Sequence, residues 1–388
     1  MRNICDKNKC SGCGLCVAQC PKSAISLEIV GLHYYPKINR DKCVDCGVCQ
    51  KNCPNNNAIK LNPVKSCFVA WSNDDYDHFE CASGGLATTI SKKFIQNGGY
   101  VVGCAWNKDF RATSFVTNDI DDLEKFRKSK YVHNYFSKDV YHEILTLLKS
   151  GKKVLFIGVS CQCEAVKRFA GKWIDNLFVI SLLCHGGASP KLFNEHISGF
   201  RKKLKNIGDI TFRGGEFDCQ FCLWDDHKKL IYKNGQFTDP YFYSFMRHTM
   251  YRKSCLSCAY AQDQRPSDLT LADFWGLDEM IVKKHNLNRG VNLVLLHTEK
   301  GEELLSLVKN DATFIERPLQ EAIAGNDTLK EPTPKPFQYD LLNMMFPIFG
   351  LKASLYLFDF EFQRKKMRKF VRSLIPDFIV KFIKRIHS

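Results

Sequence analysis

Two runs of four cysteines near the start of the chain repeat one spacing pattern, with steps of two, two and three intervening residues and a proline at the end. The first run comprises Cys10, Cys13, Cys16, Cys20 and Pro21. The second begins 33 positions later and comprises Cys43, Cys46, Cys49, Cys53 and Pro54. Three thiolates at such short steps let one tight loop bind three iron corners of a 4Fe–4S cube, and a cysteine from elsewhere reaches the fourth corner. The repeat therefore predicts two 4Fe–4S clusters.

The fourth cysteine of each run is expected to serve the other cluster, as in two-cluster ferredoxins. One cluster would be held by Cys10, Cys13, Cys16 and Cys53, and the other by Cys20, Cys43, Cys46 and Cys49. The alternative is zinc, which favours two separated cysteine pairs over four evenly stepped cysteines. Residues 1–62 closely resemble a bacterial-type two-cluster ferredoxin domain, which implies an α+β ferredoxin-like module. Cys5 lies outside the pattern and receives no role.

The composition is that of an ordinary globular protein. The chain has 388 residues, 45% hydrophobic and 25% charged, so neither wholesale disorder nor a membrane bundle is expected. Its 19 cysteines, together with a start (MRNICDKNKC) that lacks the apolar run of a signal peptide, indicate metal or redox chemistry in a reducing cytoplasm. Residues 364–388 carry +8 of the formal charge of +15, so the body is only mildly basic and no nucleic-acid partner is expected.

From residue 63 to about 330, short apolar segments alternate with segments of helical period. Predicted strands are 100–106, 153–158, 176–183, 209–213, 269–274 and 291–297, and predicted helices are 86–96, 139–148, 190–205 and 299–308. This alternation indicates an α/β domain with a central, partly parallel sheet. Ser83-Gly84-Gly85 precedes the first of these helices, where backbone amides would suit a pyrophosphate, although a plain turn has the same signature.

Several segments of this domain, in a fixed order, resemble the motifs of one family. They are Ser83-Gly84-Gly85, Ser129-Lys130-Tyr131-Val132, VLFIGVSCQ (154–162), LLCHGGASP (182–190), SCLSC (254–258), DLTLADFWG (268–276) and NLVLLHTEKG (292–301). Over roughly residues 5–330 the chain resembles the coenzyme F-420 hydrogenase/dehydrogenase beta-subunit family. Within it, the most similar subgroup carries an N-terminal ferredoxin module and is associated with bacterial surface-polysaccharide biosynthesis. The resemblance implies an iron–sulfur flavoprotein with an α/β FAD-binding domain.

The resemblance also implies a third 4Fe–4S cluster next to the flavin. Its ligands would be Cys161, Cys184, Cys255 and Cys258, which fall on cysteine-bearing motifs of the family. Cys161 and Cys184 both follow predicted strands, so they are expected at carboxyl ends of strands, where α/β sheets place their sites. Buried structural thiols and zinc are the alternatives. The family usually has proline where this chain has Ser160.

Candidates for flavin binding and catalysis come from the same motifs and from two arginines that lie outside them. Lys130 would place a positive charge near the flavin pyrimidine ring, unless it is a solvated surface lysine. Arg213 and Arg265 would bind phosphates or form ion pairs. His185 and Asp273 would transfer protons, although a histidine beside a cluster ligand also suits a hydrogen bond to a cluster sulfur. The cofactor-binding set is thus Ser83, Gly84, Gly85, Lys130 and Arg213, and the catalytic set is Lys130, His185 and Asp273. Six further cysteines receive no role: Cys67, Cys81, Cys104, Cys163, Cys219 and Cys222.

Residues 331–388 are expected to form a proline-rich linker and a helical tail. The apolar stretch 341–358 is broken by Pro347 and Lys352, which argues against a membrane-spanning helix. Between residues 367 and 386, apolar residues recur at three- and four-residue steps with basic residues between them, and Pro376 would kink the resulting amphipathic helix. Such a helix suits the inner face of the cell membrane, and docking on the protein body or on a sister subunit of a homo-oligomer is the alternative.

The sequence thus predicts a three-part enzyme: a ferredoxin domain (1–62), an FAD and iron–sulfur domain (63–330) and a tail (331–388). A low-potential donor such as ferredoxin or a reduced deazaflavin would reduce the clusters, and FAD would pass electrons to an organic substrate. The subgroup suggests a sugar, nucleotide-sugar or lipid-linked substrate, with coenzyme F-420 as an alternative. The competing hypothesis is an electron-transfer subunit that feeds a partner enzyme and has no substrate of its own.

Overall fold

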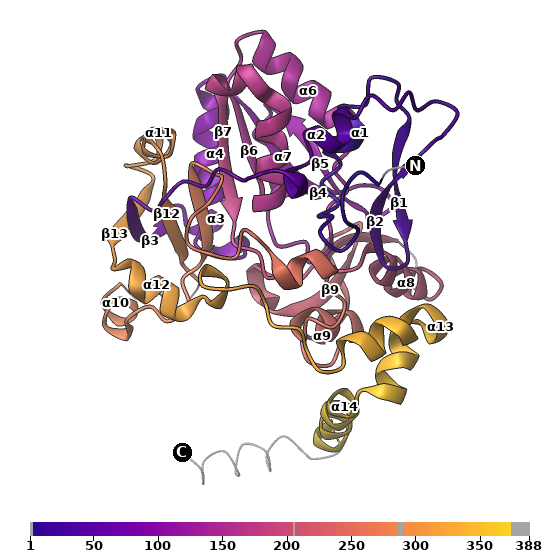
Figure 1. The fold of residues 1–388 in the computed structure, drawn as a ribbon. Coiled ribbons are helices and arrows are strands. Elements are labelled where there is room, and N and C mark those ends of the chain that lie inside the picture. Colours follow the sequence, from indigo (N-terminus) through magenta and orange to yellow (C-terminus); the bar gives the residue numbers. More distant parts are fainter. Residues whose placement is uncertain (1–2, 205, 286, 288–289, 374–388) are drawn as a thin grey trace.

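The computed structural model describes residues 3–204, 206–285, 287 and 290–373, and of residues 368–373 it describes the backbone only. A small N-terminal module is followed by a large mixed sheet with helices, a smaller antiparallel sheet and two C-terminal helices (Figure 1). The predicted mixed α/β fold with an N-terminal ferredoxin-like module is confirmed.

The N-terminal module repeats in structure as it does in sequence. It contains α1 (Leu15–Ala18), the antiparallel hairpin β1 (Ile25–Val30) and β2 (His33–Ile38), α2 (Val48–Lys51) and the 3-10 turn η1 (Pro54–Asn56). Each short helix begins after a glycine in the left-handed region, Gly14 (φ 83°) before α1 and Gly47 (φ 74°) before α2. Glycine reaches this conformation without a steric penalty, which lets the chain turn sharply between the second and third cysteine of each run.

The central sheet has eight strands in the order β13-β3-β12-β11-β7-β6-β4-β5. Their bounds are β3 (Ser66–Ser72), β4 (Tyr100–Trp106), β5 (Ala112–Thr117), β6 (Val154–Val159), β7 (Leu177–Leu182), β11 (Leu269–Asp273), β12 (Asn292–Leu296) and β13 (Ala312–Glu316). Strands β4, β6, β7 and β11 pair in parallel, and the other pairings are antiparallel. The pairings also orient β3 along β11, so the carboxyl ends of these five strands share one edge of the sheet.

Helices cover both faces of this sheet. Val154 and Phe156 of β6 belong to one buried cluster with residues of α6 (Lys138–Lys149) and α7 (Ser160–Ala170). Leu155, between them, belongs to a second cluster with residues of α4 (Leu86–Gln96) and α11 (Glu299–Leu307). Alternate side chains of a strand point to opposite faces, so a strand apolar at every position requires cover on both sides.

A smaller sheet and two helices form a second packing layer. Strands β8 (Ile207–Thr211), β9 (Gln220–Asp225) and β10 (Leu230–Gly235) pair antiparallel. They share an aromatic core, including Phe212 and Phe221, with α8 (Pro190–Arg201) and α9 (Pro240–Met246). The strand predicted at 209–213 therefore belongs to this sheet, and the helix predicted at 190–205 ends earlier, at Arg201.

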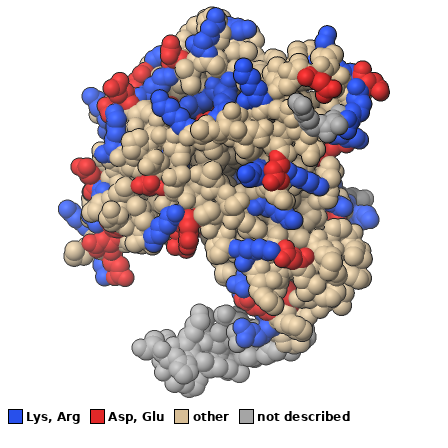
Figure 2. All heavy atoms as spheres, in the orientation of Figure 1, with Lys and Arg blue, Asp and Glu red and all other residues tan. Residues whose placement is uncertain are grey.

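The remaining short elements connect these layers. They are α3 (Asp75–Glu80), α5 (Leu123–Phe126), η2 (Gly171–Asn176), η3 (Gly215–Phe217), η4 (Lys253–Ser257), α10 (Glu279–Lys284), α12 (Leu319–Gly325) and η5 (Asp327–Leu329). On the face shown in Figure 2, Lys and Arg gather mainly over the upper part of the molecule and lie among Asp and Glu elsewhere.

Two helices follow the proline-rich linker. Helix α13 (Tyr339–Phe358) contains Pro347 and departs from helical geometry at Gly350, and α14 (Phe360–Ser373) follows it. Leu342, Phe346 and Leu355 of α13 are buried against α8 and α9. Among the described residues, α13 alone is long and apolar enough to cross a membrane. Its most apolar window has a mean hydropathy of 1.4 and is 28% buried, and one such helix is weak support for a membrane span. Most of the predicted amphipathic tail, 374–388, lies outside the described residues.

Candidate functional site

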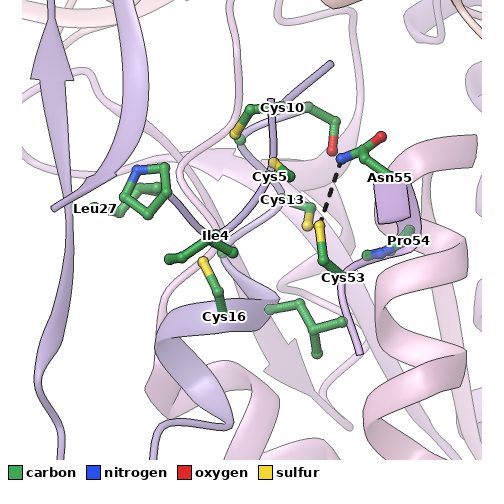
Figure 3. Close-up of a pocket in the computed structure, with 14 residues that line it drawn as sticks. Ile4, Cys5, Cys10, Cys13, Cys16, Leu27, Cys53, Pro54 and Asn55 are labelled. Carbon is green, nitrogen blue, oxygen red and sulfur yellow. Dashed lines mark hydrogen bonds between the residues drawn. The ribbon is translucent and has the colours of Figure 1, made fainter. Parts of the chain in front are cut away.

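Four of the eight ferredoxin-type cysteines line one small pocket, as the predicted exchange of fourth ligands requires. They are Cys10, Cys13, Cys16 and Cys53. Figure 3 shows their sulfur atoms around one space, with Cys5 among them and Pro54 at the margin. Cys10 and Cys13 lie in the loop that leads into α1, Cys16 lies in α1 itself, and Cys53 precedes η1 at the end of the second run. A cubic cluster needs four thiolates from at least two segments, so the pocket fits the group that the spacing predicts.

Neighbouring groups favour the anionic form of two of these thiols. A hydrogen bond from the Cys5 thiol lowers the pKa of Cys10 to about 6, and the charge of Arg252 acts in the same direction. The Cys5 thiol also lowers the pKa of Cys53 to about 7, and the Asn55 amide donates to the Cys53 Sγ over 3.9 Å. Nothing in the spacing pattern indicated that Cys5 would share this pocket.

The other four ferredoxin-type cysteines are more exposed. Cys46 is exposed, and Cys20, Cys43 and Cys49 are partly buried. Burial raises the pKa of Cys49, and the nearby thiols of Cys20 and Cys46 add to the shift. The backbone N–H of Ala24 donates to the Cys20 Sγ over 3.3 Å, a contact that stabilises a thiolate. Three of the four predicted ligands are therefore electrostatic neighbours.

The cysteines predicted to form a third set lie at the carboxyl edge of the central sheet. Strands β6 and β7 pair in parallel with Val159 opposite Leu182. Two residues beyond each of these lie Cys161, in the first turn of α7, and Cys184. Cys255 lies in η4 and Cys258 directly follows it.

All four of these thiols are electrostatic neighbours. Burial raises the pKa of Cys161 well above its usual range, and Cys258, Cys184 and Cys255 add to the shift in that order. The backbone N–H of Gly187 donates to the Cys255 Sγ over 3.2 Å. Three separate segments thus carry four neighbouring thiols, and the backbone N–H of Gly187 already donates to one of them.

This set adjoins the pocket of the N-terminal module. Cys13 is among the groups that raise the pKa of Cys161, and α1 contacts both α6 and α7. The hydroxyl of Tyr141, on α6, donates to the carbonyl of Cys13 over 3.0 Å. The N-terminal module is therefore packed on the edge of the sheet that carries the third set of cysteines.

Ser160, where the family usually has proline, contacts a buried arginine. Arg265 donates to the carbonyl oxygens of Tyr260 and Thr328 and approaches the Ser160 Oγ at 3.4 Å. It is 3% exposed, and its charge lies near Cys258 and Cys184. The guanidinium thus lies beside the third set of cysteines.

The predicted pyrophosphate loop packs tightly against the sheet. Ser83 donates its hydroxyl to the carbonyl of Val291 over 2.9 Å, and the N–H of Leu86 donates to the Asn292 side chain over 3.0 Å. A Cβ atom on Gly84 would lie 2.7 Å from the carbonyl oxygen of Ala70. One of the amides at the start of α4 is therefore already hydrogen-bonded within the protein.

Arg213 and Asp273 form an ion pair beside this loop. The Arg213 Nη1 lies 2.9 Å from an Asp273 carboxylate oxygen, and Nε lies 2.7 Å from Asp218. Nη2 donates to the carbonyl of Ala82 over 2.6 Å, and Nη1 to the hydroxyl of Tyr131 over 3.3 Å. Burial opposes the charge, but Tyr131 and the carboxylates raise the pKa of Arg213. Two predicted site residues thus meet in one charged network.

Lys130 and His185 lie near this network. The ammonium of Lys130 donates to the carbonyls of Lys125 and Arg127 over 2.7 Å each, and burial lowers its pKa. Its side chain is partly buried, and both carbonyls hold the ammonium in place. Burial lowers the pKa of His185, while the nearby carboxylate of Asp273 opposes the shift. His185 thus lies near the Arg213–Asp273 ion pair, whereas the ammonium of Lys130 is bound by the carbonyls of Lys125 and Arg127.

Comparisons with known proteins match both the N-terminal module and a large part of the domain that follows it. The family model for the C-terminal part of the coenzyme F420 hydrogenase/dehydrogenase beta subunit matches residues 151–322. The model described as "4Fe-4S dicluster domain" matches residues 9–57. The predicted family resemblance is confirmed. The chain is thus an oxidoreductase-like iron–sulfur protein of electron-transfer type, related to the F420 hydrogenase beta subunit.

A solved structure is similar over a large part of the chain. It is entitled "Xenon derivatization of the F420-reducing [NiFe] hydrogenase complex from Methanosarcina barkeri". The match has 18% sequence identity and a TM-score of 0.48, and covers 69% of this chain and 87% of the other. No curated protein matches the sequence.

Proposed function

We propose that this chain is an iron–sulfur flavoprotein oxidoreductase with three 4Fe–4S clusters and one FAD. Three sets of four cysteines would hold the clusters: Cys10, Cys13, Cys16 and Cys53; Cys20, Cys43, Cys46 and Cys49; and Cys161, Cys184, Cys255 and Cys258. When bound, these groups supply single-electron transfer and its conversion to a two-electron step. The boundaries 1–62, 63–330 and 331–388 remain those of the proposed ferredoxin, catalytic and tail regions.

The observation that carries the proposal is the packing of the first set of cysteines beside the third set, through α1 against α6 and α7. Cys13 is an electrostatic neighbour of Cys161, although the two lie far apart in sequence, in regions that match different family models. Electron transfer between centres falls steeply with distance, so adjoining ligand sets are what a relay needs. A low-potential donor such as a ferredoxin or a reduced deazaflavin would act at the N-terminal module.

The residues proposed to bind FAD surround the start of α4. Ser83, Gly84 and Gly85 would approach its pyrophosphate, and Arg213 would hold a negative group beside them. Lys130 would stabilise the anionic form of the reduced ring. His185 and Asp273 would hold and move protons at the substrate, which we place among sugar, nucleotide-sugar or lipid-linked molecules of surface-polysaccharide synthesis.

Anaerobic purification with quantitation of iron, sulfide and released flavin tests this proposal. We expect about twelve iron atoms and one FAD per chain, since each cube contains four irons. About eight iron atoms would remove the third cluster, and zinc without acid-labile sulfide would contradict the whole proposal.

One observation favours the alternative, an electron-transfer subunit with no substrate of its own. The loop proposed to bind the pyrophosphate already uses the Leu86 N–H to bind Asn292. Full cluster content without flavin, or turnover only with a partner enzyme, would support this alternative.

We further propose that the C-terminal region binds the inner face of the cell membrane. Large apolar side chains of α13 and α14 face solvent, among them Met344 (58% exposed), Ile348 (66%) and Phe360 (80%). The sequence from Arg364 onward adds nine basic residues and one acid. Exposed apolar side chains beside positive charge suit an anionic lipid interface. Contact with a second copy of the chain is the alternative occupant.

A further inference from the structure

Arg252 is a fully buried cation between the first and third sets of cysteines. Its side chain is 0% exposed, and none of the ion pairs among the described residues includes it. Nε donates to the carbonyl of Cys10 over 2.5 Å, and Nη2 donates to the carbonyl of Tyr34 and lies 3.7 Å from the Cys10 Sγ. The guanidinium also stacks over the ring of Tyr35 at 4.2 Å.

The backbone of Arg252 is hydrogen-bonded to the segments that carry the third set of cysteines. The Arg252 N–H donates to the carbonyl of Gly187 over 3.0 Å, and the N–H of Gly187 donates to the Cys255 Sγ. The N–H of Cys255 in turn donates to the carbonyl of Arg252 over 2.9 Å. One residue therefore joins the loop that carries Cys10 to the loop that carries Cys255.

A buried guanidinium without an anionic partner is strongly unfavourable. Nη1 of Arg252 has no hydrogen-bond partner, so the neutral carbonyls leave part of the cation unsatisfied. The side chains beside it that can carry negative charge are the cysteines: Nη2 lies 3.7 Å from the Cys10 Sγ, and the Cys255 N–H donates to the carbonyl of Arg252. A cysteine-bound cluster is the anion that this position lacks.

The histidines next to Arg252 do not supply competing charge. Burial, and then the charge of Arg252, lower the pKa of His133 to about 3. The same two causes, in the same order, lower the pKa of His33 well below its usual range. Both imidazoles are neutral near pH 7, so Arg252 is the fixed positive charge at this junction.

We propose that Arg252 is the shared counter-charge of the clusters held by Cys10 and Cys255, and that it raises the reduction potential of both. Reduction adds one negative charge to a cluster, and a fixed cation nearby stabilises the reduced state more than the oxidised state. This inference rests on the proposed function, because it requires clusters in both sets. Arg252 acts as a positioning residue, since it binds the ligand loops rather than a substrate.

Arg265 offers a matched comparison within the same chain. It too is buried, it has an Nε atom without a hydrogen-bond partner, and its charge lies near Cys184 and Cys258. Its hydrogen bonds run to Ser160, Tyr260 and Thr328, and none of these reaches the loop that carries Cys10. Removing the charge of Arg265 should therefore affect the third cluster and leave the first unchanged.

The test is a redox titration of the anaerobically purified full chain, in which electron paramagnetic resonance monitors the reduced clusters. We expect Arg252→Gln to lower the midpoint potentials of two clusters, Arg265→Gln to lower one, and Arg252→Lys to stay near wild type. Iron content is measured for each variant. Unchanged potentials in Arg252→Gln at full iron content would overturn the inference.

If Arg252→Gln loses iron, its potentials cannot be compared with wild type. Arg252→Lys then tests the role of the positive charge. Lysine keeps the charge but loses the planar stacking and one or more carbonyl contacts. Iron retained by Arg252→Lys at near wild-type potentials supports a role of the charge. Equal loss of iron in both variants shows a purely structural role and overturns the inference. A wild-type chain with about eight irons would instead refute the third cluster of the proposed function. The change in midpoint potential of the cluster at Cys10 in Arg252→Gln could still be measured in that case.

Discussion

Two cysteines of α7, Cys161 and Cys163, occupy contrasting environments. Cys161 lies close to Cys184, Cys255 and Cys258. Cys163 is 0% exposed, and its thiol is directed at the carbonyls of Gly158 and Ile180, at 3.5 and 3.7 Å. A step of two residues turns a helix by about 200°, so the two side chains lie on nearly opposite sides. Only one of the two is suited to bind a cluster.

We predict that Cys161→Ala loses about four of twelve irons, because one corner of the third cluster would lack its thiolate. Cys163→Ala is the matched control: it removes a buried thiol from the same helix and should keep the full iron content. Iron and acid-labile sulfide assays measure the difference. Equal iron content in Cys161→Ala and wild type would contradict the assignment.

His297 predicts a pH dependence of stability. Its ring is 2% exposed and lies between the Thr270 hydroxyl (2.9 Å) and the carbonyl of Pro63 (3.1 Å), and burial lowers its pKa to about 4. A histidine with a lowered pKa stabilises the fold fully above its unfolded pKa of about 6.5, and loses this contribution as pH falls to 4. The loss amounts to about 3 kcal/mol.

We therefore expect wild type to melt well above His297→Gln at pH 7, with the gap in melting temperature narrowing as the pH falls from 6.5 to 4. Differential scanning fluorimetry across this range measures the gap. A constant gap would show that His297 does not titrate in the folded protein.

At the scale of elements, α6 anchors the N-terminal module to the central sheet. The buried Tyr141 hydroxyl donates to the carbonyl of Cys13, and the His142 ring lies 3.0 Å from the carbonyl of Ala18. Leu15 and Ala18 of α1 belong to the same buried cluster as residues of α6 and α7. The position of Cys13 therefore depends on Tyr141, which lies 128 residues later in the chain.

Tyr141→Phe should destabilise this junction by roughly 1–2 kcal/mol, because it leaves the buried carbonyl of Cys13 without its donor. We expect a lower melting temperature and faster loss of iron to a chelator. Tyr356→Phe, at a tyrosine that is 40% exposed, is the control and should change neither. Identical chelation rates in both variants would argue against the role of this contact.

Helices α13 and α14 carry the exposed apolar side chains of the proposed membrane contact. Ile348→Asp combined with Phe360→Asp should reduce binding to vesicles of anionic phospholipid severalfold, since charged groups replace apolar side chains at the lipid interface. Gln96→Asp adds a charge at an exposed position of α4 and should bind like wild type. Cosedimentation measures binding, and a wild-type chain that stays in the supernatant as a dimer would favour docking on a sister subunit.

At the scale of the whole molecule, the two ends of the proposed iron–sulfur relay differ in the amount of buried apolar surface around them. The cluster of buried residues around the N-terminal cysteines contains Ile4, Ile25 and Cys53 and is otherwise only partly buried. The central sheet has large apolar clusters on both faces. A module of about 60 residues buries too little apolar surface to be stable without a staple such as a metal centre.

Removal of iron from the intact chain should therefore unfold residues 1–62 locally and leave the sheet folded. Hydrogen exchange measured by mass spectrometry should become roughly tenfold faster or more in β1 and β2, with β6 and β7 little changed. Equal acceleration in both regions, or none in β1 and β2, would contradict this expectation.

Much of the fold could be predicted from the periodicity of the sequence, and the errors in that prediction have local physical causes. The helix predicted at 86–96 matches α4, and the strand predicted at 100–106 matches β4. The prediction at 209–213 found a strand but placed it in the central sheet, because a short apolar segment carries no information about which sheet it joins. Strand β3 and helix α7 were not among the predicted elements.

The cysteine spacing by itself determined the pair of N-terminal clusters, because ligands of one loop lie within a few residues of one another and their geometry is local. Only the tertiary structure brought Cys13 beside Cys161, placed Cys5 in the first pocket and buried Arg252 between two sets of cysteines. Those contacts join segments separated by more than 100 residues in two of the three cases, and their energy comes from packing and desolvation rather than from local spacing. Charge and burial at a junction are properties of the folded chain, which is why the residue proposed to tune both clusters carried no signal in the sequence.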